Sequence, residues 1–206
     1  MIVNFTHLHQ YQSLLTLPGS TSPIERTFQT KLLGYWLTMD MKPDTHVAYM
    51  LKIAYSRLWS ITRLKAAGVS DDDIFYFFTV KIRSVLEFSA PIFTSMLSEE
   101  NISDIERIQK IVFRVILTER YTDYESACIL MNAKSLKMRR SDLSLSFALN
   151  CLKTPQHQHL FKERKSLYYT LRNIKSFEEP LCLSERYKCS PLPFLTRLLN
   201  EHFSRK

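Results

Sequence analysis

The most regular pattern of apolar and polar positions runs from Ser98 to Leu117. Apolar side chains recur there at steps of three or four, so one face of a helix collects them: Ile102, Ile105, Ile108, Val112 and Ile116. The charged residues fall largely away from that face: Glu106, Arg107, Lys110 and Arg114. Ser98 offers an N-cap oxygen, and the glutamates after it suit the first turn. The pattern predicts a helix with a sharply defined start, around which the other helices pack.

Two helical patterns precede this segment. The first begins at Asp44 or Thr45 and continues to Ala67, and Gly68 follows where a left-handed residue ends a helix. The second begins after Ser70, which is followed by three aspartates. It is nearly apolar all round as far as Phe88, so we expect it to be buried between layers and to end at Pro91.

Further helices are predicted after Leu117. One covers Tyr121 to Met131, and a longer one covers Ser135 to Leu152 and is stopped by Pro155. We expect Leu136, Leu143 and Phe147 to point inward from the longer helix. Two more are expected near Leu160 to Asn173 and near Phe194 to Phe203.

The first 40 residues show the period of two that is typical of strands. Candidate strands lie at Met1 to Phe5, Tyr11 to Leu17, Pro23 to Phe28 and Lys31 to Thr38, the last interrupted by Gly34. Pro18-Gly19-Ser20-Thr21 supplies turn residues for a hairpin. The fold class expected is therefore mainly α with a small N-terminal antiparallel β-sheet (α+β). We expect three regions: residues 1 to 40, a helical domain at 41 to 153, and a basic extension at 154 to 206.

The composition indicates a globular chain that is not exported. The 206 residues are 45% hydrophobic, which is enough to bury a core. No apolar run is long enough to span a membrane, and Met1 to Phe5 is followed by polar residues rather than by a signal-peptide core. We therefore expect an intracellular protein, in the nucleus or cytoplasm, that is not secreted. Its four cysteines, Cys128, Cys151, Cys182 and Cys189, are expected to be reduced thiols.

The positive charge is concentrated in the last third of the chain. Residues 1 to 133 carry 13 Lys and Arg against 14 Asp and Glu, a balance of −1, whereas residues 134 to 206 carry 15 against 6, a balance of +9. Such an excess favours a polyanion such as nucleic acid, or an acidic membrane surface. The alternative is a solvated surface that keeps the protein soluble.

Nothing in the sequence has the pattern of a catalytic or metal site. Asp71-Asp72-Asp73 suits the first turn of a helix better than a metal cluster, because consecutive helical residues point in different directions. Cys182, Cys189 and His202 are too irregularly spaced for a zinc finger or knuckle. The pairs His7 with His9 and His157 with His159 are interpreted as polar loop residues. We therefore expect no metal, no cofactor and no enzymatic activity from this chain on its own.

Two basic clusters are the better evidence for a function. Lys134, Lys137, Arg139 and Arg140 crowd the start of one predicted helix, and Lys162, Arg164 and Lys165 are followed by Tyr168 and Tyr169. Arginine donates in pairs to phosphate, and tyrosine can stack on unpaired bases. The alternative is that the tyrosines are core and the arginines are solvated. Cations at a helix N-terminus oppose its dipole, so either a bound polyanion or a nearby acid would relieve them.

An ordered set of short motifs covers nearly the whole chain and resembles the C-terminal region of reverse transcriptases from non-LTR retrotransposons of the jockey-like type. In chain order the motifs are Asn4-Phe5-Thr6, Lys31-Leu32-Leu33-Gly34, Gly68, Ile82 to Glu87 with Ser89-Ala90, Leu97 to Asn101, Asp104 to Lys110, Glu119-Arg120-Tyr121 with Tyr124 and Ala127, Leu136-Lys137 with Arg139-Arg140, Leu145 to Ala148, Glu185-Arg186-Tyr187 and Pro193-Phe194-Leu195.

The resemblance implies a polymerase fragment without its active site. Leu32-Leu33-Gly34 would belong to the primer-grip hairpin at the end of the palm, Gly34 would allow close approach of the primer backbone, and the following helices would form a thumb-like bundle. The palm carboxylates that hold two magnesium ions are absent from the sequence and would lie upstream of Met1. We expect the fragment to bind RNA or an RNA/DNA hybrid, and the missing palm and fingers or another protein as a further partner. The alternative is a non-catalytic helical interaction domain or transposon relic.

The residues expected to contact nucleic acid lie in the hairpin, in the first helix and in the two basic clusters. They are Lys31, Gly34, Arg57, Arg63, Lys65, Lys134, Lys137, Arg139, Arg140, Lys162, Arg164 and Lys165.

Overall fold

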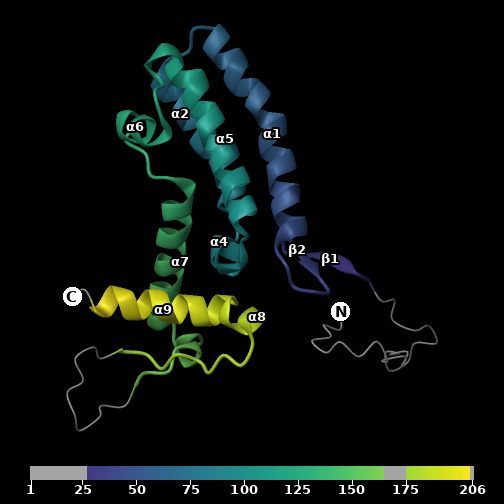
Figure 1. The fold of residues 1–206 in the computed structure, drawn as a ribbon, viewed down its shortest axis with the longest axis vertical. Coiled ribbons are helices and arrows are strands. Elements are labelled where there is room, and N and C mark those ends of the chain that lie inside the picture. Colours follow the sequence, from purple (N-terminus) through teal and green to yellow (C-terminus); the bar gives the residue numbers. More distant parts are fainter. Residues whose placement is uncertain (1–26, 165–174, 205–206) are drawn as a thin grey trace. The chain divides into compact units, whose positions relative to one another are not determined.

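A computed structural model of the chain describes residues 27 to 164 and 175 to 204. Most of these residues are helical, and a two-stranded antiparallel sheet lies near the N-terminus, so the predicted fold class is confirmed (Figure 1). The chain divides into two compact units, Met1–Tyr49 and Met50–Lys206. The divisions predicted after residues 40 and 153 stay predictions, and the three strands predicted before Lys31 lie almost wholly outside the described residues.

The first unit contains a β-hairpin where the sequence suggested one interrupted strand. Strand β1 (Gln29–Leu32) pairs antiparallel with β2 (Tyr35–Thr38), and Leu32 lies opposite Tyr35. Leu33 and Gly34 form the two-residue turn, with φ angles of 48° and 89°. Positive φ at both central residues is the requirement of a type I′ turn, whose twist matches that of the strands it joins. The glycine therefore marks a turn between two strands.

Helix α1 (Asp44–Ala66) continues from the first unit into the second. Its C-terminus has the predicted glycine, because Gly68 has a φ of 74°. The Gly68 N–H donates to the Lys65 carbonyl at 3.1 Å, and the Val69 N–H donates to the Leu64 carbonyl at 3.2 Å. This pair of bonds is the Schellman motif, which satisfies carbonyls that the helix end leaves without partners.

The next helical segment buries one face only. It consists of α2 (Asp71–Phe78), the π-helical segment η1 (Thr79–Arg83) and α3 (Ser84–Leu86). Ser70 caps it as predicted, accepting the Asp73 N–H at 3.2 Å. Four side chains at steps of four are buried: Ile74, Phe78, Ile82 and Leu86.

The opposite side of this segment is exposed, so the prediction of burial all round is wrong. Tyr76 and Val80 are exposed, although both are apolar enough to suit a core. Four residues of an α-helix overshoot a full turn by about 40°. The wider π-helical turns offset that drift and keep one row of side chains facing the core.

A bend and two short helices lead to the central helix. Ser89 adopts a φ of 59°, so the preceding helix ends at Leu86 and Pro91 lies within the first turn of α4 (Ala90–Phe93). A 3₁₀ turn, η2 (Thr94–Met96), follows. Helix α5 (Glu99–Leu117) then begins where predicted, because Ser98 accepts the Asn101 N–H at 3.1 Å. Helices α2, α6 (Tyr124–Leu130) and α7 (Leu136–Lys153) pack on α5, whereas α4 packs mainly on α7, so the prediction that the other helices pack around α5 is confirmed for three of them only.

Two helices after α5 differ in detail from the sequence pattern. A 3₁₀ turn, η3 (Thr118–Arg120), precedes α6 (Tyr124–Leu130), whose N-cap is Asp123, so α6 is shorter than predicted. Helix α7 (Leu136–Lys153) is capped by Ser135. Its buried positions are Leu136, Arg140, Ser144, Ala148 and Cys151, whereas Phe147 is exposed and Leu143 is half-buried. The inward position of Leu136 is confirmed and that of Phe147 was wrong. Phe147 lies between Leu136 and Arg140 around the helix, so what packs beside each turn, and not the period, decides its exposure.

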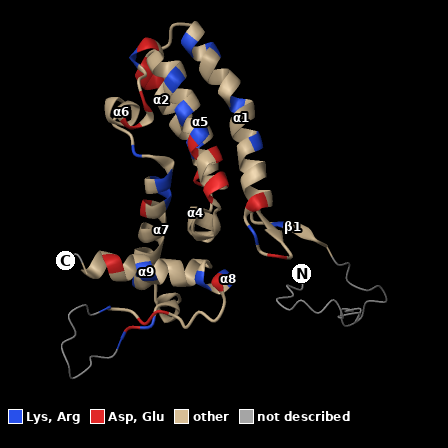
Figure 2. Cartoon of the chain, viewed as in Figure 1, with Lys and Arg blue, Asp and Glu red and all other residues tan. Residues whose placement is uncertain are grey.

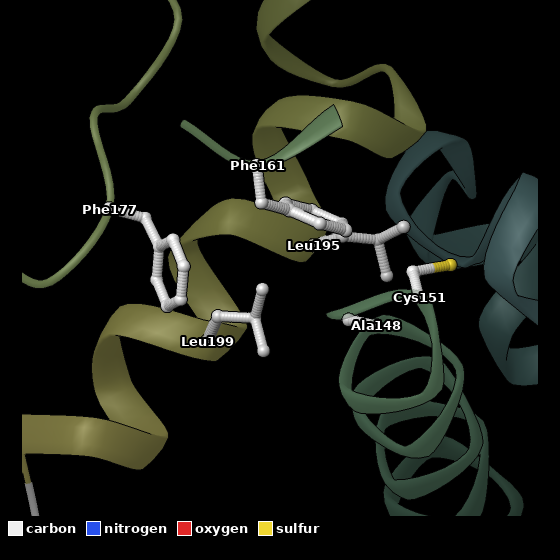
Figure 3. Packing of buried hydrophobic residues seen from close by; sticks show 6 residues of the cluster. All are labelled: Ala148, Cys151, Phe161, Phe177, Leu195 and Leu199. Carbon is white, nitrogen blue, oxygen red and sulfur yellow. The ribbon is translucent and has the colours of Figure 1, made fainter. Parts of the chain in front are cut away.

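The C-terminal part closes the lower end of the second unit. The 3₁₀ turn η4 (Gln158–Leu160) and the short helix α8 (Glu185–Lys188) precede α9 (Pro191–Ser204), which lies across the end of α7 (Figure 1). Figure 3 shows the apolar cluster that joins α7, α9 and the two segments that contain Phe161 and Phe177. Its members are Ala148, Cys151, Phe161, Phe177, Leu195 and Leu199. The helix predicted from Leu160 is wrong as far as Arg164, since Glu163 forms an antiparallel bridge with Phe177. Its remainder, residues 165 to 173, lies outside the described residues.

Candidate nucleic-acid interface

The start of α7 is held by a buried carboxylate from α5. Glu106 is only 7% exposed, so the expectation that it faces away from the core is wrong. Its Oε2 accepts the Leu136 N–H at 3.2 Å and the Tyr124 hydroxyl, and its Oε1 accepts the Lys137 N–H. These are the first two N–H groups of α7, which have no partner inside the helix and lie at the positive end of its dipole. A nearby acid, one of the two expected ways of relieving the basic helix start, is therefore present.

Gln109, three residues after Glu106 on α5, completes this junction. Gln109 Nε2 donates to the Lys134 carbonyl and to the Tyr124 hydroxyl, each at 3.1 Å. Burial, and then the hydrogen bond to Glu106, raise the pKa of Tyr124 well above its usual value. The α5 face that carries these two polar side chains therefore fixes both α6 and the segment leading into α7.

Arg140 is a buried side chain that lies within the electrostatic influence of this carboxylate, and it is not a surface cation. It is 1% exposed, and burial lowers its pKa while the negative charges of Glu106 and Glu87 oppose that effect. Its Nε and Nη1 have no hydrogen-bond partner among the described residues. A guanidinium in this position cannot contact a nucleic acid, so Arg140 does not belong to the predicted interface.

Arg139 is also engaged within the bundle. Its Nη2 donates to Glu87 Oε2 at 2.9 Å, and its Nε donates to Glu87 Oε1, which makes a bidentate pair. Arg83 lies 3.8 Å from the same carboxylate. The Glu87 contact raises the pKa of Arg139 above its ordinary value, whereas burial lowers that of Arg83. Arg139 thus ties α7 to the segment after α3.

Three cations of α5 lie beside this buried network; Arg107 and Arg114 are exposed and Lys110 is half-buried. Counting 100° per residue around α5, three cations lie on one side of the direction of Glu106: Lys110 at about 40°, Arg114 at about 80° and Arg107 at about 100°. Lys110 and Arg114 each lie over a tyrosine ring, with cation-to-centroid distances of 5.2 Å to Tyr124 and 5.3 Å to Tyr121. These contacts hold the two long side chains against the bundle.

Two cations from the start of α7 join them. Lys134 and Lys137 are exposed, and their backbones contact Gln109 and Glu106. Lys134 forms a solvent-exposed ion pair with Asp142 at 2.6 Å, a contact of small energetic weight. We call Arg107, Lys110, Arg114, Lys134 and Lys137 the α5–α7 basic surface. Figure 2 shows Lys and Arg recurring along α5 and at the start of α7.

The remaining predicted residues are not part of this surface, and several have structural contacts. Arg57 donates to the Lys81 carbonyl in the π-helical segment, and Lys65 donates at 2.7 Å to both Asp71 and the Ile116 carbonyl. Arg63 is exposed and lies over the Trp59 ring.

In the first unit, Lys31 donates to the Tyr49 hydroxyl at 2.9 Å and Gly34 forms the hairpin turn.

The C-terminal cluster is only partly described. Lys162 pairs with Glu178 at 2.9 Å, and Arg164 is exposed. Lys165, Tyr168 and Tyr169 lie outside the described residues. Their expected contact with nucleic acid stays a prediction.

Sequence reasoning did not select Arg107, Lys110 and Arg114 as site residues. Their spacing of three and four was visible, but it was interpreted as the solvated side of a helix. Only the packing of α6 and α7 against α5 shows that two further lysines lie beside them.

Within residues 27 to 164 and 175 to 204, no three His, Cys, Asp or Glu side chains gather as metal ligands would. Asp71 instead lies at the helix start, where hydrogen bonds from Lys65 and Arg120 lower its pKa.

The four cysteines, all in the described part, are free thiols. Among the described residues, none of the helices combines the length and the apolar character that a membrane span requires. No protein-family model matches the chain, and no match was found among the curated proteins or the solved structures.

Proposed function

We propose that this chain is a non-catalytic module that binds RNA or an RNA/DNA hybrid on the α5–α7 basic surface, and that it derives from the C-terminal region of a non-LTR retrotransposon reverse transcriptase. The observation that carries the proposal is the sorting of charges at one junction. Glu106 is turned inward onto the start of α7, while five Lys and Arg side chains lie around it on the outside. The inward acid leaves the outer cations available to phosphates.

The kind of contact follows from the side chains present. Lysines and arginines on separate elements neutralise phosphates and release counterions, which gives affinity without base specificity. The surface therefore suits a duplex or hybrid backbone. The polymerase step is not assigned to this chain, because the sequence holds no aromatic-Ala-Asp-Asp motif or lone palm aspartate in the family order.

Removal of three exposed cations tests the proposal. We combine Arg107→Gln, Arg114→Gln and Lys137→Gln in one variant. Its negative slope of log affinity against log salt should be shallower by roughly 2.7 than that of the wild-type chain, because each neutralised phosphate contributes about 0.9. The measurement is fluorescence anisotropy of a labelled RNA/DNA hybrid over a series of salt concentrations.

A matched control removes the same charge elsewhere. Lys42, Lys153 and Lys188 are exposed. Lys42 precedes α1, Lys188 lies on α8, and Lys153 is the last residue of α7, about 24 Å along the helix from Lys137. Changing all three to Gln should leave most of the slope unchanged. An equal loss in both triple variants would mean that net charge alone drives binding. No binding of the wild-type chain at low salt would overturn the proposal.

One observation favours a second function, a helical module that binds another protein. Tyr76 and Val80 form a short exposed apolar row, four residues apart, on the continuous segment from α2 to η1. Exposed apolar rows often mark interaction surfaces. If this row mediates self-association, light scattering should show concentration-dependent oligomers that Tyr76→Ser with Val80→Ser abolishes, whereas a monodisperse monomer at all concentrations counts against it.

A further inference from the structure

The second-unit part of α1 carries an aromatic and basic row that the proposed function does not use. From Met50 to Ala66 the helix contains four Lys and Arg and no Asp or Glu. Lys52, Tyr55, Trp59 and Arg63 are all exposed, with exposed fractions of 42% for Tyr55 and 65% for Trp59. We call these four residues the α1 stripe. Figure 2 shows the cations spaced along this helix.

The spacing places the α1 stripe on one narrow face. Steps of three, four and four residues keep the four side chains within an arc of about 80° and spread them over about 16 Å of helix. The Arg63 guanidinium lies 5.0 Å from the centroid of the Trp59 ring. The other two cations of this part are already engaged, since Arg57 donates to the Lys81 carbonyl and Lys65 pairs with Asp71.

Helix packing does not account for the two aromatic side chains. The buried residues of α1 in the second unit are Met50, Ala54 and Ile61, which lie on the opposite face. An exposed tryptophan forgoes the burial that makes this side chain stabilising in a core. Trp59 is therefore placed at the surface, between Lys52 and Arg63, without a structural reason among the described residues.

We infer that the α1 stripe binds single-stranded nucleic acid, with unpaired bases stacking on Trp59 and Tyr55 and with Lys52 and Arg63 neutralising the flanking phosphates. Aromatic rings on a cationic track are the arrangement that binds single strands without sequence preference, because every base has a stacking face. Cations with no acid among them match the phosphate charge. The inference rests on the proposed function, since the chain must bind nucleic acid, and it adds a second site with a preference for unpaired bases.

The test uses the fluorescence of Trp59 itself. The chain contains two tryptophans, so a Trp36→Phe background leaves Trp59 as the only indole emitter. An oligo(dT) of about twelve nucleotides, within the range that single-strand sites cover, should quench this emission. An abasic oligonucleotide of the same length keeps the phosphates but offers no bases to stack. It should bind at least about tenfold more weakly.

Substitutions supply a second measurement. Trp59→Ser should weaken oligo(dT) binding in anisotropy by about tenfold or more, and Trp59→Phe should recover part of it because a ring remains. Phe147→Ser is the matched control, an exposed aromatic removed from α7, and it should leave oligo(dT) binding unchanged. Equal affinity for the abasic and the dT oligonucleotide, or an unchanged affinity of Trp59→Ser, would overturn the inference.

The two proposals fail in different ways. If the hybrid binds through the α5–α7 basic surface while Trp59 emission does not respond to oligo(dT), only the α1 stripe is refuted. If neither the hybrid nor oligo(dT) binds at low salt, the proposed function and this inference are both wrong.

Discussion

The buried carboxylate at the start of α7 gives the sharpest prediction of stability. In Glu106→Gln the side-chain volume is kept, but the negative charge beside buried Arg140 is lost. The amide oxygen can still accept hydrogen bonds, although its NH₂ group cannot accept from the Lys137 N–H. A buried N–H left without its acceptor typically costs about 1–3 kcal/mol, and Arg140 also loses a negative charge that offsets its burial. That is a large fraction of the roughly 5–15 kcal/mol by which a domain is stable.

Urea unfolding followed by far-UV circular dichroism measures this cost. Glu119→Gln is the matched control, since Glu119 is exposed, and its effect should stay within about 0.5 kcal/mol. In the double variant Glu106→Leu with Arg140→Leu, the total loss should be smaller than the sum of the single losses, because neither charge is left alone. A loss below about 1 kcal/mol for Glu106→Gln, or strict additivity of the leucine pair, would refute the reasoning.

Three further predictions concern pH and the hairpin. The hydrogen bond from Lys65 lowers the pKa of Asp71 below its ordinary 3.8, so the contact stabilises the fold above about that pH and this stabilisation is lost as pH falls through the folded pKa. Asp71→Asn should therefore cost at most about 1 kcal/mol of unfolding free energy at pH 7 and almost nothing near pH 2, measured by urea unfolding at both pH values. Tyr124→Phe should cost about 1.5–3 kcal/mol at neutral pH through the lost bond to Glu106. Burial raises the pKa of Tyr124 above 10.0, so the wild-type chain should also lose more stability than this variant as pH rises past 10, in the same assay. Leu33→Asn should slow hydrogen exchange of the hairpin amides, because asparagine accepts the positive φ of this turn more readily than leucine, and faster exchange would contradict the turn assignment.

The residues at helix ends show how far local sequence reaches. Ser70, Ser98 and Ser135 each accept an N–H of the first turn of the helix that follows. Gly68 takes the left-handed conformation after α1. Caps depend on a few neighbouring residues, so sequence alone predicts them.

The hairpin and the C-terminal segment show where local reasoning stopped. Gly34 was assigned to an interruption within one strand, yet a two-residue turn at Leu33 and Gly34 makes two strands that pair with each other. The non-helical bridge between Glu163 and Phe177 depends on residues fourteen positions apart. Pairing of this kind is decided by what lies across the strand, and a local period does not contain that information.

For the candidate site, the sequence determined the cations and the tertiary structure decided which of them are available. Lys134, Lys137, Arg139 and Arg140 look equivalent in the sequence, but the last two are held by Glu87 and by burial beside Glu106, whereas the two lysines stay exposed. The helical period fixed which residues share a face of α5, and its apolar stripe is buried as predicted except at Ile102, which is half-buried. It did not show that Glu106 and Gln109 would also be buried, because the N–H and carbonyl groups that they bind belong to a helix start about 30 residues later. A polar side chain can be buried without a large cost only where it finds a hydrogen-bond partner, and tertiary packing alone brings that partner into place.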